Sequence, residues 1–116
     1  MTEEVKVKKK RNKSEEQKIQ TGIKDWCKKV GLFCYKNSTV GIYDPRSSTF
    51  IPAPKKGITD LTILLKGKAY WVEVKKPKGI LSEDQIKFIQ DVEETGNIAF
   101  TVYSIEEFKS YFEPLI

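Results

Sequence analysis

Apolar residues recur along this chain with two different periods, and polar turn residues separate the stretches. Apolar side chains three or four residues apart predict amphipathic helices at about 15–30, 83–95 and 105–112. Runs rich in β-branched and aromatic residues predict strands at 32–36, 59–65, 69–75 and 97–103. This order of elements predicts a small α/β domain with a mixed central sheet flanked by helices.

Each predicted helix opens with a serine whose side chain can accept a bond from the backbone three residues later. A Gln or Glu at that third position can return the bond, which makes a capping box. The three predicted boxes are Ser14–Gln17, Ser82–Gln85 and Ser104–Glu107.

The segment from 37 to 56 is rich in Gly, Ser and Pro and predicts either a loop or a small hairpin arm. Its candidate DNA contacts are Tyr43, Arg46, Lys55 and Lys56, because cations hold phosphate and an aromatic ring can stack on a base. A solvated connection with no such role fits the same residues.

Three polar side chains in the two central strands can meet. Asp60 stands at the head of the first strand, and Glu73 and Lys75 lie in the second. A two-residue turn at 66–67 places Asp60 opposite Glu73, whereas a turn at 67–68 places Asp60 opposite Lys75. Because side chains alternate along a strand, both registers put the three groups on one side of the sheet.

The Glu-x-Lys tripeptide at 73–75 is not informative by itself. With 11 Glu and 19 Lys in 116 residues, about two such tripeptides arise by chance, and the chain contains four. Only this one lies in a β-branched and aromatic strand that follows a strand headed by an acid.

Two carboxylates and a lysine on one sheet face suit the cleavage of a phosphodiester. Cleavage needs charge neutralisation at the phosphate and a source of hydroxide, and a carboxylate-bound Mg²⁺ assists with both. Asp60 and Glu73 can supply oxygen ligands, and Lys75 can reach the water or the phosphate. The alternative is a lattice of cross-strand ion pairs on a solvated face.

Composition narrows the classes of protein. The length fits one domain, and we expect its folded part to cover 14–116. The absence of histidine excludes nucleases with a histidine base and His-rich zinc sites.

Cys27 and Cys34 lack metal-ligand spacing and indicate buried thiols in a reducing compartment. Without a long apolar stretch or a secretory signal, we expect a cytoplasmic protein.

The formal charge of +5 is concentrated near the N-terminus. Residues 1–13 hold six cations and two carboxylates, and we expect them to form a basic flexible tail. Its candidate DNA contacts are Lys8, Lys9, Lys10 and Arg11, which can bind a polyanion through counterion release. A solubilising extension is the alternative.

One acid in the first predicted helix has an unusual place. Glu16 lies three residues before Ile19 and seven before Ile23, so it projects along the apolar stripe that enters the core. A carboxylate near a helix N-terminus is also stabilised by the helix dipole, and the pattern alone favours that explanation.

Several segments together resemble one nuclease family. They are 56–61 (Lys-Gly-Ile-Thr-Asp-Leu), Gly67, Val72–Lys75, Gly79–Gln85 with Phe88, Glu16–Gln20 and Gly41–Asp44. This set resembles the VRR-NUC domain, the virus-type replication-repair nuclease of the PD-(D/E)XK superfamily. The likeness spans roughly Glu16 to Glu107.

The resemblance implies a restriction-endonuclease-like core and a set of site residues. The residues that it assigns to catalysis are Asp60, Glu73, Lys75, Gln85 and Glu16. The implied ligands of Mg²⁺ or Mn²⁺ are Asp60, Glu73, Glu16 and the carbonyl of Val74. Lys75 would help to activate water, and Gln85 would position water or phosphate. The family typically has proline where this chain has Thr59, and that proline shapes the strand start without touching metal.

Small stand-alone members of this family, typically viral, resemble Holliday junction resolvases that act as homodimers. One active site per chain cuts one strand, and resolving a four-way junction needs two symmetric cuts. The resemblance therefore implies a structure-selective DNA endonuclease that works as a homodimer, in the host cell cytoplasm if the chain is viral. Candidate interface residues are Ile42, Tyr43, Phe50 and Ile51, or Phe108, Tyr111 and Phe112, for which core packing is the simpler role.

Two other functions stay open. A nicking or restriction-type nuclease would prefer a linear sequence over a branched shape. A catalytically inactive DNA-binding module would use its carboxylates structurally and bind through the basic tail. Clustered acids near phosphate do not help binding alone, which argues against the module.

Overall fold

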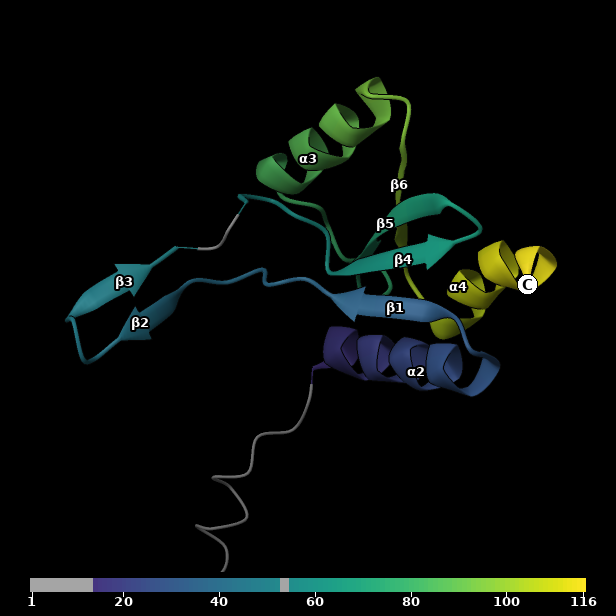
Figure 1. Ribbon diagram of the computed structural model, residues 1–116, viewed down its shortest axis with the longest axis horizontal. Coiled ribbons are helices and arrows are strands. Elements are labelled where there is room, and N and C mark those ends of the chain that lie inside the picture. The colour runs from purple at the N-terminus through teal and green to yellow at the C-terminus, as the bar shows by residue number, and fades with distance from the viewer. Residues whose placement is uncertain (1–13, 53–54) are drawn as a thin grey trace, which may run out of the picture.

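The computed structural model describes residues 14–52 and 55–116 (Figure 1). The basic tail predicted at 1–13, with Lys8, Lys9, Lys10 and Arg11, lies outside the described residues. None of the helices in the described ranges has both the length and the hydropathy of a membrane-spanning segment.

The helices and strands expected from the sequence are present, each within two residues of its predicted bounds, and the segment 37–56 contains a hairpin. In chain order the elements are α2 (Glu15–Val30), β1 (Phe33–Lys36), β2 (Ile42–Asp44), β3 (Thr49–Ile51), β4 (Leu61–Leu65), β5 (Lys68–Val74), α3 (Glu83–Glu94), β6 (Ile98–Val102), α4 (Ile105–Phe112) and the 3₁₀ turn η1 (Glu113–Leu115).

The central sheet is mixed, as predicted, with the strand order β1-β4-β5-β6. β1, β4 and β5 are antiparallel, and β6 runs parallel to β5 after the α3 crossover. Leu61 pairs with Val72, which is the register of a turn at Lys66–Gly67. Both turn residues have positive φ, 52° and 81°, as a type I′ hairpin turn requires. Of the two possible registers, the structure therefore selects the one that faces Asp60 toward Glu73.

Helices cover the two faces of the sheet unequally (Figure 1). α2 and α4 lie on one face, where the fully buried core residues are Ile23, Cys27, Leu61, Ile63, Val72, Val74, Val102, Phe108 and Phe112. On the other face α3 packs over β5, with the Phe88 ring 5.7 Å from that of Trp71 in an edge-on contact. The core role expected for Phe108 and Phe112 is confirmed, whereas Tyr111 is 46% exposed.

Two of the three predicted capping boxes are complete, at Ser14 and Ser82. The prediction at Ser104 is wrong in its second half, because Glu107 Oε1 accepts from the backbone N–H of Tyr103, at 2.7 Å. Ser104 is more extended than the other two N-cap residues, with φ −160°, so the N–H of the preceding residue meets the carboxylate instead.

The two cysteines are free thiols in neighbouring elements. Cys27 in α2 is fully buried, as predicted, and Cys34 in β1 is half-buried against the same core. A hydrogen bond with the Cys34 thiol, together with burial, raises the pKa of Cys27. A buried protonated thiol of this kind suits packing.

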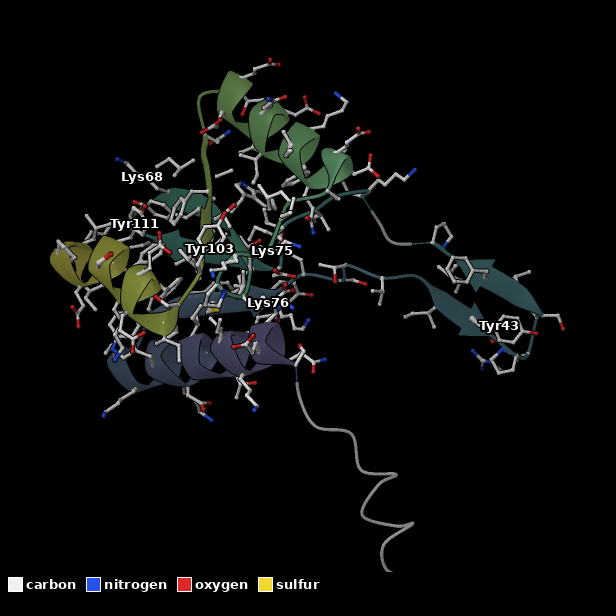
Figure 2. All side chains as sticks on the ribbon, turned by 180° about the vertical axis from the view of Figure 1, so that it is seen from behind. Tyr43, Lys68, Lys75, Lys76, Tyr103 and Tyr111 are labelled. Carbon is white, nitrogen blue, oxygen red and sulfur yellow. The ribbon has the colours of Figure 1, made fainter. Side chains whose placement is uncertain are left out.

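The β2–β3 hairpin stands apart from the central sheet (Figures 1 and 2). Its apolar residues are each more than half exposed: Ile42, Tyr43, Phe50 and Ile51. Tyr43 pairs with Phe50 and Ile42 with Ile51, so aromatic side chains project from one face of the ribbon and aliphatic ones from the other.

Candidate active site

Asp60 and Glu73 meet at one end of the central hairpin. Asp60 directly precedes β4, and the register of the hairpin brings it beside the last residues of β5. Its Oδ2 accepts the backbone N–H of Val74 at 2.8 Å. Both carboxylates are withdrawn from solvent, with 9% of Asp60 and 2% of Glu73 exposed.

The two carboxylate oxygens of Glu73 differ in their hydrogen-bond partners. Oε2 accepts from Gln85 Nε2 at 3.0 Å and lies 4.0 Å from Lys75 Nζ. Oε1 is buried and has no hydrogen-bond partner among the residues that the structure describes. A buried charged acceptor without a partner is costly, so this oxygen is available to a ligand that the protein itself does not supply.

Gln85 connects the start of α3 to the acid. Its side-chain oxygen accepts the N–H of Ser82 at 2.9 Å, and its own N–H donates to Ser82 Oγ at 3.2 Å. Its side-chain Nε2 donates to Glu73 Oε2. The capping box that begins the helix therefore also orients a carboxylate of the site, a contact that the sequence pattern did not predict.

Asn37 is a site residue that the sequence analysis did not single out. Its N–H donates to the Asp60 carbonyl at 2.8 Å, and its Nδ2 donates to the Thr59 carbonyl at 3.0 Å. Its Oδ1 accepts from Thr62 Oγ1 at 3.1 Å. The signal in the sequence is only a polar residue after a short strand, which most loops also show. Asn37 thus holds the end of β1 against the start of β4.

Thr59, at the position where the family typically has proline, is fully buried. Its hydroxyl donates to the Leu61 carbonyl at 3.4 Å, so it finds a partner within its own strand start. The side chain contributes to packing and does not line the hollow described below.

The site has a surplus of negative charge in poorly hydrated surroundings. Burial, and then the charge of Asp60, raises the pKa of Glu73 to about 8, although Lys75 acts in the opposite direction. Burial also raises the pKa of Asp60, against the Val74 N–H and the positive charge of Lys36. Two carboxylates that are hard to ionise together are typical of a site that a cation completes.

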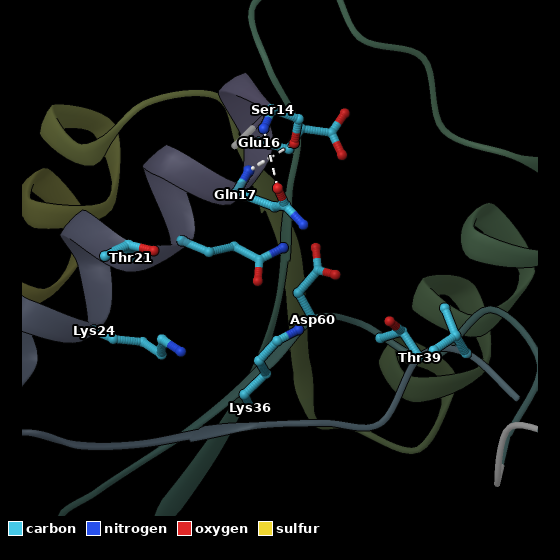
Figure 3. A pocket seen from close by; sticks show the side chains of 10 residues that line it. Ser14, Glu16, Gln17, Thr21, Lys24, Lys36, Thr39 and Asp60 are labelled. Carbon is cyan, nitrogen blue, oxygen red and sulfur yellow. Dashed lines mark hydrogen bonds between the residues drawn. The ribbon is translucent and has the colours of Figure 1, made fainter. Parts of the chain in front are cut away.

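The acids open into a hollow of about 370 Å³, whose lining includes Glu16, Thr39, Lys75 and Asp84. A second hollow of about 560 Å³ shares Glu16 and Asp60 and is lined by Lys24 and Lys36. Figure 3 shows Asp60 between Glu16 of α2 and Lys36 of β1. A negatively charged polymer can therefore lie beside the acids along a wall that carries lysines.

The structure brings together most of the predicted site residues, but not all of them. Asp60, Glu73, Lys75 and Gln85 form one cluster, and Glu16 is half-buried at its rim. Within the described residues, no group of three or more acidic or thiol side chains is close enough to hold a metal ion. The close oxygen donors are thus two carboxylates.

The predicted DNA contacts of the 37–56 segment lie at different distances from these acids. Tyr43 and Arg46 are on the hairpin that stands apart, and Arg46 pairs with Asp44 at 3.6 Å (Figure 2). Lys56 Nζ lies 3.9 Å from Asp84, which lines the hollow, and Lys55 is exposed beside it. Of these four residues, Lys56 is the one that contacts the lining of the hollow.

The donor set fits a hard divalent cation. Mg²⁺ and Mn²⁺ prefer carboxylate, carbonyl and water oxygens. The unpaired Oε1 of Glu73, with the Asp60 carboxylate next to it, offers such oxygens where the protein leaves their charge uncompensated.

The raised pKa of Glu73 makes the stability of the metal-free protein pH-dependent. Below about pH 4.5 the carboxyl is protonated in both the folded and the unfolded chain, and between about 4.5 and about 8 only the folded chain keeps the proton. The free energy of unfolding therefore falls as the pH rises through this window. In EDTA, we expect the Tm to fall by about 5 °C or more between about pH 5 and about pH 8. Glu73→Gln should flatten this dependence, and an equal fall in both proteins would contradict the assignment.

Gly57 determines how closely the loop before Asp60 packs on α3. Its φ is +76°, and a Cβ there would overlap the carbonyl of Asp84. We expect Gly57→Ala to lower the free energy of unfolding by about 2–3 kcal/mol in urea titrations, because strain and overlap add. Gly67 is the matched control, since it has φ +81° and open space around it, so Gly67→Ala should cost only about 1 kcal/mol. If both variants lose the same free energy of unfolding, the close packing of Gly57 on Asp84 does not contribute to stability.

These features define a small α/β domain with a buried pair of acids, a lysine and a glutamine at one end of its central hairpin. The same fold is found in a solved structure described as a "VRR_NUC domain protein". The match has a TM-score of 0.60 and 20% sequence identity, and it covers 91% of each chain. The chain thus has a VRR-NUC domain fold, as the resemblance of its motifs implied. No protein-family model matches the chain, and a search of curated proteins finds no relative.

Proposed function

We propose that this protein is a metal-dependent endonuclease that hydrolyses phosphodiester bonds in DNA. The observation that carries the proposal is the buried pair Asp60 and Glu73, with an unpaired carboxylate oxygen, beside Lys75 and Gln85 in one hollow. The name of the structural neighbour, a VRR_NUC domain protein, agrees with nuclease chemistry.

Mg²⁺ or Mn²⁺ would be held by Asp60, Glu73 and the backbone carbonyl of Val74, with water completing the shell. When bound, it supplies charge neutralisation at the phosphate and lowers the pKa of a bound water. Glu16 would complete the acidic cluster from the rim of the hollow.

The protein's own side chains have separate tasks in this proposal. Lys75 Nζ, with 13% of the side chain exposed, faces the hollow and can donate to the attacking water or to a phosphate oxygen. Gln85 keeps Glu73 in position through its amide. Lys24 and Lys36, which line the adjoining hollow, can hold neighbouring phosphates of the same strand.

We infer that the substrate is branched DNA, with a four-way junction as the leading candidate, and that the protein acts as a homodimer. Two symmetric cuts need two copies of a one-site chain. The exposed apolar residues of the β2–β3 hairpin are the better interface candidate, because Phe108 and Phe112 are fully buried in the core. A nicking or restriction-type nuclease and an inactive DNA-binding module are the competing functions.

A cleavage assay separates these functions. Purified protein is incubated with a labelled four-way junction and with a linear duplex of matched sequence, each with Mg²⁺ and with EDTA. We expect paired symmetric cuts in the junction, and none in EDTA. Equal cutting of both substrates would indicate a general or sequence-directed nuclease, and DNA binding that survives EDTA without any cleavage would favour the inactive module.

A further inference from the structure

The sheet face that carries Glu73 is only partly covered. Phe88 of α3 packs on Trp71 in β5, and this covers the half of the face near β5 and β6. On the β1–β4 half, Phe33 is 53% exposed, Tyr35 60% and Leu64 45%. Phe33 and Tyr35 lie on the edge strand β1 and Leu64 on the inner strand β4. Large apolar side chains that are exposed beside one another on one sheet face form a patch of the kind that marks an interaction surface.

The strand pairing shows that these side chains share the face of the acid. Tyr35 pairs with Thr62, and Thr62 pairs with Trp71, so the three side chains project from the same side of the sheet. Glu73 follows Trp71 by two residues and therefore projects from that side as well. Phe33, two residues before Tyr35, completes a row of two aromatic rings on one strand.

Asn37 connects the strand that carries these two rings to Asp60. Asn37 follows Tyr35 by two residues, and its backbone N–H donates to the Asp60 carbonyl at 2.8 Å. The rise of a strand then places Tyr35 roughly 7 Å and Phe33 roughly 13 Å along β1 from the level of Asp60. Both rings are thus on a rigid element that leads directly away from the two acids.

The chemistry of this surface suits the bases of a nucleic acid. β1 and β4 together contain one cation, Lys36, and no carboxylate. Lys36 alternates with Tyr35, so it projects from the other side of the edge strand β1, where it lines the adjoining hollow with Lys24 of α2 and phosphates would be held. A strand that crosses the edge at β1 can thus keep its phosphates at the lysines and its bases at the rings, and aromatic rings suit single-stranded nucleic acid because every base has a flat face that can stack.

We propose that Phe33 and Tyr35 form a stacking platform for unpaired bases of the strand that is cut. The platform rests on the proposed nuclease function and names its substrate more closely: DNA in which bases next to the cleaved bond are unpaired, as at a branch point. A paired duplex keeps its bases stacked on each other, so it gains nothing from the two rings.

A binding experiment in EDTA tests the platform without cleavage. The probes are a forked duplex with unpaired arms and a blunt duplex of equal length, and the fork carries 2-aminopurine in one arm to report stacking. We expect the double variant Phe33→Ala/Tyr35→Ala to bind the fork about tenfold more weakly, with a change of about twofold or less for the blunt duplex. The fluorescence quenching of 2-aminopurine should be lost in the double variant and retained in Tyr35→Phe.

Tyr111→Ala is the matched control, because Tyr111 is an exposed aromatic residue on α4, which packs on the opposite face (Figure 2). It should bind both probes as the parent protein does, and circular dichroism should show that all variants are folded. Equal weakening for fork and duplex, or none, overturns the platform while leaving the nuclease proposal to the cleavage assay.

Two further outcomes overturn the platform in different ways. A change of oligomeric state of the double variant in sedimentation, with unchanged fork binding, would assign the two rings to an interface between copies. A parent protein that binds neither probe and cuts no DNA would overturn both the platform and the proposed function.

Discussion

Replacing Asp60 with asparagine is expected to lower DNA cleavage by at least about 100-fold. Loss of a residue that only supports a metal ligand typically costs about 10- to 100-fold, and the loss of a direct ligand should cost more. The substitution preserves shape, and the asparagine Oδ1 can still accept the N–H of Val74. Single-turnover cleavage of the preferred substrate with saturating Mg²⁺ measures the effect.

Asp91→Asn provides the control for the loss of one negative charge. Asp91 lies on α3, pairs with Lys87 at 3.2 Å and does not line the hollow of the acids. Its variant should cut at nearly the parent rate. If Asp60→Asn cuts as fast as Asp91→Asn, Asp60 does not hold a catalytic metal, and the acids at the end of the hairpin are structural.

Replacing Lys75 with methionine is expected to lower the cleavage rate by about 100-fold, at the lower end of what a positioned proton-transfer group contributes. Methionine keeps an unbranched side chain, so packing beside Glu73 is largely preserved. The lost cation is the group 4.0 Å from Glu73 Oε2 that opposes the rise in the pKa of this acid. The rate should be measured across pH at saturating substrate, so that binding and the chemical step are separated.

Lys76→Met is the matched control, because Lys76 directly follows Lys75 in the chain, is exposed and has the same charge (Figure 2). Its loss should weaken DNA binding slightly and leave the rate at saturation unchanged. Equal losses of rate in the two variants, both relieved by lower salt, would mean that Lys75 acts only through general attraction for DNA.

The sequence was sufficient for the local structure of this domain. The helices begin at serines because a side-chain oxygen satisfies the free N–H groups of the first turn, and this is a short-range effect. It was also sufficient to put Asp60, Glu73 and Lys75 on one side of the sheet, because strand periodicity alone requires this in both possible registers. The prediction failed at Ser104, where the backbone is extended. There the N–H of Tyr103, and not that of Ser104, donates to the Glu107 carboxylate.

The tertiary structure decided everything that depends on burial and on contacts between distant segments. It selected the register, directed the Gln85 amide toward Glu73 and hydrogen-bonded Asn37 to Asp60. Within the described part of the chain it also left one oxygen of Glu73 without a partner. It also left Phe33 and Tyr35 exposed on the edge strand β1. The sequence by itself determined which groups could meet, because alternation and capping act over a few residues. The packing of whole elements decided the pKa of Glu73, because desolvation depends on distant segments. It also decided which half of the sheet face is exposed.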